Sequence, residues 1–551
     1  MSTTTNIPAP PDVPAPVAGT ADWLDQRLGL SKVVRGFARK IFPDHWSFML
    51  GEVALYSFVV LVLSGTFLTL FFVPSMGHTT YEGAYLPMNG QGMSEAYAST
   101  LKLSFDIRGG LLMRQVHHWS ALLFVAAIAA HMFRVFFTGA FRKPREVNWV
   151  IGVVLALLAL GAGFSGYSLP DDMLSGNGLR IIDGVVKSIP LVGTYVSFFL
   201  FGGEFPGYDI IPRLFVVHVM IIPAAIIALI GAHLALLVVH KHAQYPGPGR
   251  TNSNVVGYPL MPVYMAKAGG FFFVVFGIIA LISATISINA VWNYGPYDPS
   301  PVSAGTQPDW YIGWIDGALR LMPGQLEWVI FGHTLSLNVL VPALVVPGVA
   351  VMAAMFYPFI EAAATGDKRE HHLLDRPRNA PTRTGLGVMA IVAYCILWAA
   401  AGNDLMATHF DMSINDLTWA FRIGLFVVPP LAFYITRRIC LGLQRKDREI
   451  ALHGRETGRI VRTPEGEYYE VHEPLDEYQR WNLVQHETYQ PTTPQLTDSA
   501  GIAAPDAAKQ RRQARLSRFF FEHRVEPARP SELHHEQEDD HGHSELEDVK
   551  Q

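Results

Sequence analysis

Four histidines lie inside two apolar segments at spacings that suit a helix. His117 and His131 stand near the two ends of "RQVHHWSALLFVAAIAAHMFR", and His218 and His233 occupy a second segment of the same kind. In a helix, His117 and His131 fall within about 40° of one face and roughly 21 Å apart, while His218 and His233 fall within about 60°. Because an ionisable side chain in hydrocarbon is costly, each of these histidines is a functional-site hypothesis.

The directions of the two segments pair the histidines across helices. Both segments run from the outer to the inner side of the membrane, so His117 pairs with His218 in the outer half and His131 with His233 in the inner half. Two imidazoles at each depth suit iron in a planar macrocycle, which predicts two stacked haems with these four metal ligands. His118 faces about 140° away from His131 and is predicted to pack locally. The chain has two cysteines and no CxxCH motif, which excludes cysteine-ligated clusters and covalently attached haem.

Glycines on two further apolar segments repeat the spacing of the first histidine pair. Gly51 and Gly65 are 14 residues apart, as are Gly152 and Gly166. A flat porphyrin packed against a helix needs a place without a Cβ, and glycine supplies it. The four glycines are therefore predicted to line the cofactor sites.

Two arginines flank the first histidine pair. Arg114 lies three residues before His117, and Arg134 lies three residues after His131, each about one turn closer to a membrane surface. Haem propionates at those levels would be neutralised by a guanidinium group. The alternative for each arginine taken singly is a long cation that reaches the interface without a ligand.

The elements that must position these residues are membrane helices. Half of the 551 residues are hydrophobic and only 16% are charged, a composition typical of a polytopic membrane protein. We predict an all-α fold with eight transmembrane helices, of which the first four form a di-haem four-helix bundle. Apolar runs long enough to cross the bilayer occur at roughly 48–73, 115–138, 149–169, 213–239, 269–291, 335–360, 385–402 and 418–436.

The distribution of basic residues sets the orientation. Lys and Arg gather before the first span and after the second, sixth and eighth, whereas the loop between the seventh and eighth holds Asp404, Asp411 and Asp416 with no basic residue. The excess of Lys and Arg marks the cytoplasmic side. Both termini are therefore predicted to be cytoplasmic.

Four regions follow from these boundaries. Residues 1–47 form a cytoplasmic N-terminal segment whose first 20 residues are expected to be disordered, and 48–240 form the di-haem bundle. Residues 241–437 form a C-terminal four-helix membrane region with an outer "PDWY" loop. Residues 438–551 form a polar cytoplasmic extension, expected to be solvated and partly disordered, although its histidine-rich end could bind a metal.

These residues resemble cytochrome b of the quinol–cytochrome c oxidoreductases over roughly residues 40–435. Besides the histidines and glycines, the resemblance rests on "GYSLP" at 166–170 and "PDWY" at 308–311. The eight spans are similar to the undivided respiratory form, while the 15-residue histidine interval is similar to the photosynthetic type. "RKPRE" at 142–146 and the long tail look like the actinobacterial subunit, for which the resemblance implies the plasma membrane and menaquinol.

The resemblance implies a quinol-oxidation site beside the outer haem. Asp309 stands where the family commonly has Glu, and a carboxylate there acts as the general base that accepts a proton from quinol. Tyr311 is expected to hydrogen-bond the carboxylate or the quinone, and Tyr167 to line the pocket. Without the resemblance, "PDWY" would be interpreted as a turn with interfacial aromatic residues.

The inner quinone site matches the family less closely. The usual Lys-Asp pair at the start of the fifth span is Lys267-Ala268 here, so the lysine is retained and the carboxylate is absent. His240, seven residues beyond His233 at the membrane boundary, could replace the usual histidine of the site and is left unligated. Lys267 and His240 are therefore the predicted inner-site residues.

The predicted function is that of the haem b subunit of a respiratory complex. Quinol would be oxidised on the outer side, with one electron leaving to a Rieske-type iron–sulfur subunit and the other crossing two non-covalent b haems to an inner quinone. The resemblance also implies a cytochrome c subunit, a terminal oxidase in a supercomplex, membrane lipids and a homodimeric assembly; no nucleic acid is expected.

Two alternatives remain open on the residues alone. A di-haem anchor of a membrane dehydrogenase would pass electrons to quinone without dividing them between two paths. A transporter or proton channel could use the His and Arg side chains as relays.

Overall fold

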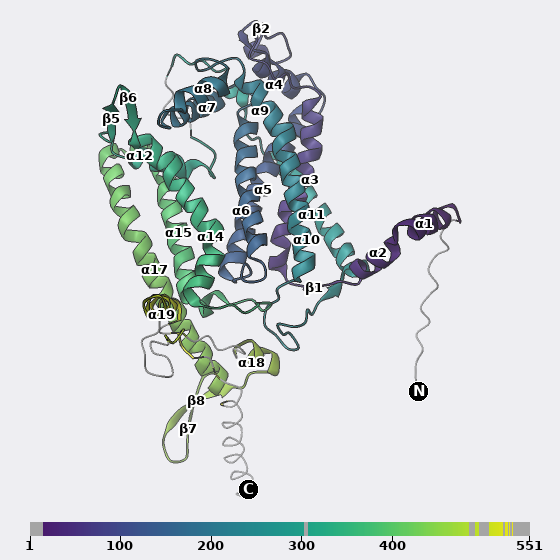
Figure 1. Cartoon of the computed structure of the whole chain (residues 1–551), viewed down its shortest axis with the longest axis vertical. Helices are drawn as coiled ribbons and strands as arrows, with labels where there is room; N and C mark the ends of the chain where they lie inside the picture. The colour runs from purple at the N-terminus through teal and green to yellow at the C-terminus, as the bar shows by residue number, and fades with distance from the viewer. Residues whose placement is uncertain are drawn as a thin grey trace.

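Eight helices are long and apolar enough to cross a membrane in the computed structural model, which describes residues 15–301, 307–483, 491–494, 506–521, 524–526, 528 and 532 (Figure 1). This confirms the predicted all-α polytopic fold. The spans comprise η1 (Trp46–Met49) with α3 (Leu50–Thr69), α5 (Gly110–Phe137), α6 (Glu146–Tyr167), α9 (Ile210–Val216) through η3 (Val217–Ile221) to α10 (Ile222–His240), η4 (Leu260–Tyr264) with α11 (Met265–Thr285), α13 (Leu337–Leu340) through η6 (Val341–Val345) to α14 (Val346–Thr365), α15 (Pro381–Ala400) and α17 (Ile414–His453).

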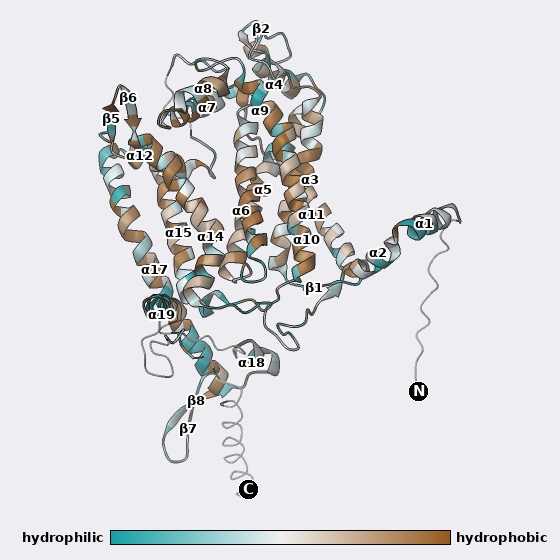
Figure 2. Ribbon diagram, in the orientation of Figure 1, coloured by the Kyte–Doolittle hydropathy of each residue, from teal (hydrophilic) through white to brown (hydrophobic). Residues whose placement is uncertain are grey.

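The spans are helical because hydrocarbon offers no partner to backbone N–H and C=O groups, which a helix satisfies internally. Figure 2 shows apolar residues along the spans and polar residues toward their ends. Two predicted spans were wrong at their edges. The fifth begins at Leu260 and ends at Thr285, because Ile286 is extended and Asn289 has a φ of 47°. The eighth continues to His453, since its Arg-, Gln- and Lys-rich end favours helix beyond the lipid.

One end of the spans, uppermost in Figure 1 and called here the upper end, carries short helices and two antiparallel hairpins. A buried cluster around Tyr81, Tyr97 and Val291 holds part of it together. Its elements are β2 (His78–Thr80), η2 (Leu86–Met88), β3 (Gly92–Ser94), α4 (Glu95–Phe105), α7 (Met173–Lys187), α8 (Gly193–Phe201), η5 (Val291–Asn293), α12 (Gly313–Leu321), β5 (Glu327–Ile330), β6 (His333–Ser336) and α16 (Asn403–Phe410).

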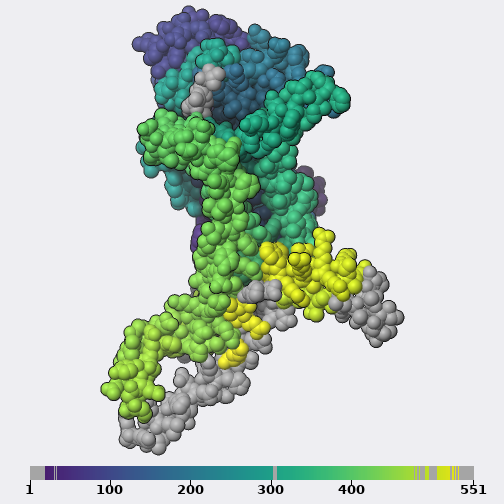
Figure 3. Space-filling model, turned by 90° about the vertical axis from the view of Figure 1, so that its left-hand side faces the viewer, coloured from purple at the N-terminus to yellow at the C-terminus, as the bar shows by residue number. Residues whose placement is uncertain are grey.

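The opposite, lower end carries the segments near both termini (Figure 1), of which Figure 3 shows the C-terminal one. Disorder was expected over the first 20 residues, but a helix begins at Ala15; residues 1–14 and the histidine-rich end at 533–551 lie outside the described residues. The lower elements are α1 (Ala15–Leu28), α2 (Leu30–Ala38), β1 (Ile41–Phe42) paired with β4 (Tyr258–Pro259), η7 (Pro377–Asn379), β7 (Arg455–Arg462) paired with β8 (Tyr468–Glu473), α18 (Glu477–Leu483) and α19 (Ala507–Phe521).

The first four spans form one bundle, in which α3 packs along α5 and α6 packs along α10. A buried apolar cluster with members from all four spans occupies its middle, including Phe58, Phe124 and Ile226. The rings of Phe58 and Phe124 lie 5.5 Å apart. Phe124 falls midway between His117 and His131 on α5, so this cluster separates two levels of the bundle.

The last spans form a second group. Helices α12, α15 and α17 pack together, with α12 lying across α15. Gly317 permits the contact, because a Cβ there would lie 1.7 Å from the carbonyl oxygen of Leu397. The segment before α12, residues 307–312, reaches the first bundle, since Tyr311 belongs to the buried apolar cluster in its middle.

Candidate functional site

The four predicted histidines meet as two pairs at two levels of the bundle. The ring centroids of His117 and His218 lie 6.1 Å apart, and those of His131 and His233 lie 6.4 Å apart. Two metal–nitrogen bonds of about 2 Å and two ring half-widths of about 1.2 Å add up to roughly 6.4 Å. Each pair therefore has the spacing that one metal ion between two imidazole nitrogens requires.

Hydrogen bonds around the upper pair determine which nitrogen is available. Nδ1 of His117 lies 3.0 Å from Oγ of Ser64, whose single proton is donated to the carbonyl of Val60 at 2.7 Å. Nδ1 of His117 must therefore be the donor. Nδ1 of His218 lies 3.0 Å from the carbonyl oxygen of Ala162, which can only accept. In both rings Nε2 is left with the lone pair that a metal ligand needs.

The lower pair lacks these serine contacts. Ser64 and Ser165 each precede one of the predicted glycines, and Oγ of Ser165 lies 3.2 Å from Nδ1 of His218. The corresponding lower positions are Leu50 and Ile151. Sequence reasoning missed the two serines, although their shared place one residue before a glycine was a signal.

Each of the four glycines faces the imidazole of one of the four histidines. A Cβ would lie 3.1 Å from Cε1 of His131 at Gly51, 3.0 Å from Cε1 of His117 at Gly65, 2.5 Å from Cε1 of His218 at Gly166, and 3.9 Å from Cε1 of His233 at Gly152. The glycines were predicted to admit a flat macrocycle; their direct contact in the structure is with the imidazole rings. Their absent side chains let the rings stand between the helices.

The two predicted arginines lie at opposite levels of the bundle. Arg114 donates a hydrogen bond of 3.0 Å from Nη1 to the carbonyl of Asn289. Arg134 lies 4.2 Å over the ring of Phe48, and its buried Nε and Nη2 have no hydrogen-bond partner among the described residues. A buried guanidinium with unpaired N–H groups suits an anionic partner such as a propionate.

A cavity of about 540 Å³ connects the upper histidine pair with the predicted quinol-site residues. Spans α3, α5, α6 and α10 and the segment before α12 contribute to its wall. It brings together many of the predicted residues and adds His118, which the sequence analysis had set aside. Its lining includes Gly65, Arg114, His117, His118, Gly166, Tyr167, His218, Asp309 and Tyr311.

Asp309 and Tyr311 form one hydrogen-bonded unit at this cavity. The Tyr311 hydroxyl donates to Oδ2 of Asp309 at 2.7 Å. Burial and the neighbouring Asp309 raise the pKa of Tyr311, so the phenol keeps its proton. The amides of Ile312 and Gly313 donate to the Asp309 carbonyl at 2.9 and 3.0 Å, which fixes the carboxylate at the start of α12. Asp309 can therefore accept a second hydrogen bond, from a donor inside the cavity.

Two buried carboxyl groups follow "GYSLP" and were not predicted as site residues. Asp172 accepts hydrogen bonds from the amide of Leu174 at 3.2 Å and from Oγ of Ser175 at 2.7 Å, so it caps α7. Burial raises the pKa of Asp171 to about 7, although a hydrogen bond from Ser94 opposes the shift. "PDD" alone is interpreted as a turn and helix cap, which explains why sequence reasoning assigned them no function.

At the lower end, Lys267 has a carboxylate partner from a distant segment. It forms an ion pair with Asp44, beside a narrow recess that Glu52 and Tyr264 also line. The hydroxyls of Tyr264 and Tyr56 both donate to Glu52, that of Tyr56 at 3.1 Å. Asp44 thus supplies a carboxylate beside Lys267, where Ala268 has none, but it lies 223 residues away in the chain, so no local pattern could indicate it.

His240, the other predicted lower-site residue, stands at the end of α10 and does not line the recess beside Lys267. Its Nδ1 is buried without a hydrogen-bond partner in the described chain. The structure therefore does not bring the two predicted lower-site residues together.

The histidine pairs fit a macrocycle better than a bare metal ion. Among the described residues, no three or more His, Cys, Asp or Glu side chains gather to hold a metal ion. Two imidazoles at each level would hold an iron ion and leave its other coordination positions to a planar ligand. The imidazole spacing, the glycine contacts and the unpaired Arg134 N–H groups all fit haem.

Comparisons with known proteins point to one family. A sequence model of the family described as "Cytochrome b(N-terminal)/b6/petB" matches residues 122–296. A "Cytochrome bc1 complex cytochrome b subunit" of Streptomyces coelicolor is 54% identical over 98% of this chain and 100% of its own length. Proteins of the same name from Corynebacterium diphtheriae and Mycobacterium tuberculosis are 52% and 50% identical, over 82% and 85% of this chain and 83% and 85% of their own lengths. A solved "Hyperthermophilic respiratory Complex III" chain shares the fold with a TM-score of 0.54 at 20% identity, covering 76% of this chain and 99% of its own.

Proposed function

The chain belongs to the family of cytochrome b subunits of cytochrome bc1 complexes, the quinol–cytochrome c oxidoreductases, and on this premise we propose how its residues divide the reaction. It is a multi-pass membrane protein that binds haem b, interacts with quinone and assembles with the Rieske and cytochrome c subunits of such a complex. The family membership sets the dehydrogenase-anchor and transporter alternatives aside.

The chain holds two b haems, one at each histidine pair. His117 and His218 are the ligands of the upper haem, and His131 and His233 are those of the lower. Arg134 would hold a propionate with its unpaired N–H groups. Arg114, which also donates to the Asn289 carbonyl, would hold one at the upper level. When bound, the haems carry single electrons between the two membrane faces.

Quinol is oxidised in the upper cavity. The observation that carries this proposal is that the Asp309–Tyr311 unit and the upper histidine pair line the same cavity of about 540 Å³. Asp309 accepts a proton from the quinol hydroxyl while Tyr311 holds the carboxylate in place, and Tyr167 forms part of the wall. One electron leaves to the Rieske subunit and the other enters the bundle.

Quinone is reduced at the lower end, near Lys267. The Lys267–Asp44 ion pair and the Glu52 carboxylate provide proton donors and acceptors beside the recess. His240 lies near the same membrane level, at the end of α10. The sequence had left this site without a carboxylate, and Asp44 and Glu52 supply two.

Basic residues gather at the lower end, and this excess supports a cytoplasmic location for both termini. The chain then lies in the plasma membrane, with menaquinol as the substrate implied by the actinobacterial relatives. Inward electron transfer opposes the membrane field by about 2.3 kcal/mol per 100 mV. The other electron of quinol must supply that free energy, which couples the reaction to the proton gradient. A homodimeric complex and a supercomplex with a terminal oxidase complete this proposal.

Rapid mixing of the oxidised, purified complex with menaquinol tests the division of electrons. We expect haem b and the iron–sulfur centre to be reduced together, in equal amounts, in the first turnover. Reduction of haem b alone would contradict the proposal, because both electrons of quinol would then follow one path.

A further inference from the structure

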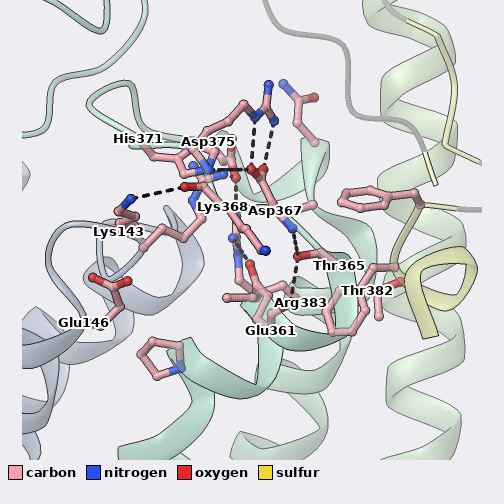
Figure 4. A pocket seen from close by; sticks show the side chains of 18 of the residues that line it. Lys143, Glu146, Glu361, Thr365, Asp367, Lys368, His371, Asp375, Thr382 and Arg383 are labelled. Carbon is pink, nitrogen blue, oxygen red and sulfur yellow. Dashed lines mark hydrogen bonds and ion pairs between the residues drawn. The ribbon is translucent and has the colours of Figure 1, made fainter. Parts of the chain in front are cut away.

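A second large cavity lies at the lower end, away from the histidine pairs. It has a volume of about 310 Å³ (Figure 4). Its wall comes from the loop after α5, the end of α14, the loop between α14 and α15, the start of α15, the end of α19 and Arg524. Six cationic and four acidic side chains line it. The cationic residues are Arg142, Lys143, Lys368, Arg369, Arg383 and Arg524, and the acidic residues are Glu146, Glu361, Asp367 and Asp375.

Part of this charge forms a buried framework. Arg383, which is 3% exposed, pairs with Glu361 at 2.9 Å and with Asp375 at 2.5 Å, and Arg142 pairs with Asp375 at 3.1 Å. Burial opposes ionisation of Asp375, but the two guanidinium groups hold its pKa below the usual value. These ion pairs therefore hold the cavity wall in place, and they neutralise two of the four acidic side chains, Glu361 and Asp375.

The remaining charged side chains leave a surplus of positive charge at the cavity. Asp367 pairs with Arg369 at 2.8 Å and with His371 at 3.2 Å. Lys143 and Lys368 are exposed and form no ion pair within the described chain; Lys143 Nζ only donates to the Lys368 carbonyl at 3.4 Å. The six cationic side chains of the lining outnumber its four acidic ones, and such an excess attracts an anion with several acceptor oxygens.

Helix α19 closes one side of the cavity and adds to the positive charge. It is docked by hydrogen bonds from Oγ of Ser517 to the Thr365 carbonyl at 3.2 Å and from Oγ1 of Thr382 to the Phe519 carbonyl at 2.9 Å. The helix appears end-on in Figure 1 and runs sideways in Figure 3, so it lies across the ends of the spans. Its exposed face carries Lys509, Arg511, Arg512, Arg515 and Arg518.

The apolar part of the cavity wall continues into the membrane-facing surface. Pro358 and Ala362, near the end of α14, line the cavity together with Phe520 and Phe521 of α19. Phe359 and Ile360 of α14 are exposed. An amphipathic basic helix at this level, with the apolar Leu516 exposed among its cations, is typical of an element that lies in the lipid headgroup region.

We propose that this cavity binds the phosphate group of an anionic phospholipid, with Lys143 and Lys368 as its principal cations and α19 lying along the surrounding headgroups. The acyl chains would run along Ala362 and the exposed side of α14. A soluble phosphate shares the headgroup chemistry, but it would make no use of the apolar wall.

The test measures lipid retention by the intact complex. We would titrate the purified complex with phosphatidylglycerol in phosphatidylcholine nanodiscs and count bound phosphatidylglycerol by native mass spectrometry. The variant K143Q/K368Q should bind it about 30-fold more weakly, since each cation near an anionic headgroup contributes about fivefold. The matched control K446Q/R459Q removes two exposed charges from the same end outside the cavity and should bind like the unaltered protein.

Two further arms complete the experiment. K143R/K368R keeps both charges and should retain the lipid, and the haem b spectrum checks that every variant is folded. Equal losses in K143Q/K368Q and K446Q/R459Q would overturn the proposal, because binding would then depend only on general surface charge. Inorganic phosphate that binds the unaltered protein in detergent and displaces all phosphatidylglycerol would also overturn it, in favour of a soluble anion.

Discussion

The upper and lower histidine pairs share one design but differ in their surroundings. Both have imidazole centroids just over 6 Å apart, at 6.1 and 6.4 Å. The upper pair is held by Ser64 and Ser165 and opens on a cavity that contains Asp309. The lower pair has Leu50 and Ile151 in place of the serines. Two sites of the proposed ligand type would therefore differ in their chemistry, because their neighbours differ.

The glycine contacts should give the largest difference between the two levels. A Cβ at Gly166 would lie 2.5 Å from Cε1 of His218, whereas one at Gly152 would lie 3.9 Å from Cε1 of His233. Gly166→Ala should therefore lose the upper haem and about half of the haem b absorbance, while Gly152→Ala should keep both haems. Haem quantification in the purified variants measures this, and equal haem contents in the two variants would contradict it.

The two quinone sites should respond to different substitutions. Asp309→Asn removes the proposed base and should slow quinol oxidation by about 10²–10⁴-fold, with both haems retained. Asp309→Glu should recover activity.

Lys267→Gln should leave the first reduction of haem b by quinol unchanged and slow its reoxidation. Stopped-flow absorbance separates the two phases, and a Lys267→Gln variant with slow haem reduction would break the assignment of the two ends.

The serine contacts should cause a smaller difference, in the redox potentials of the two haems. Nδ1–H donation makes an imidazole a stronger ligand to oxidised iron, so Ser64→Ala should raise the potential of the upper haem. A hydrogen bond of about 0.5–1.5 kcal/mol corresponds to about 20–65 mV for one electron. The reciprocal change Leu50→Ser should lower the potential of the other haem. Potentiometric titration decides this, and a shift of both haems in Ser64→Ala would contradict a local effect.

The smallest expected difference between the upper and lower ends lies in how their buried carboxyl groups make stability depend on pH. Burial raises the pKa of Asp171 to about 7 at the upper end, so the folded chain holds a proton that the unfolded chain releases near about pH 3.9. Its contribution to stability is therefore lost as pH rises from about 4 to about 7. Between about pH 4 and 7, the melting temperature of Asp171→Asn should therefore fall by about 2–4 °C less than that of the unaltered protein.

Asp375 at the lower end should behave in the opposite sense. Burial opposes its ionisation, but Arg142 and Arg383 hold its pKa below the usual value, so its contribution is present above about pH 3.9 and lost as pH falls further. Asp375→Asn should therefore leave the slope between about pH 4 and 7 unchanged. Melting curves of the two variants over this range compare the ends, and an altered slope in Asp375→Asn would contradict the assignment.

Sequence reasoning reached the fold and the histidine pairing because both depend on periodicity. Helix rise and turn place His117 and His131 on one face, and the span count makes the second and fourth spans parallel. It missed Asp44 as the partner of Lys267, since that contact joins segments 223 residues apart. It missed Ser64 because a serine in a membrane helix usually bonds its own backbone, as Ser64 also does with Val60. The end of the fifth span was misplaced because hydropathy does not report the left-handed backbone at Asn289.

The proposed function requires two separate haems at two depths of the bundle. A redox titration of haem b absorbance in the unaltered complex and in His131→Ala tests it most directly. We predict two one-electron waves in the unaltered complex, and in the variant only the wave of the upper haem, at an unchanged potential. Loss of both waves together, or retention of both, would contradict the account.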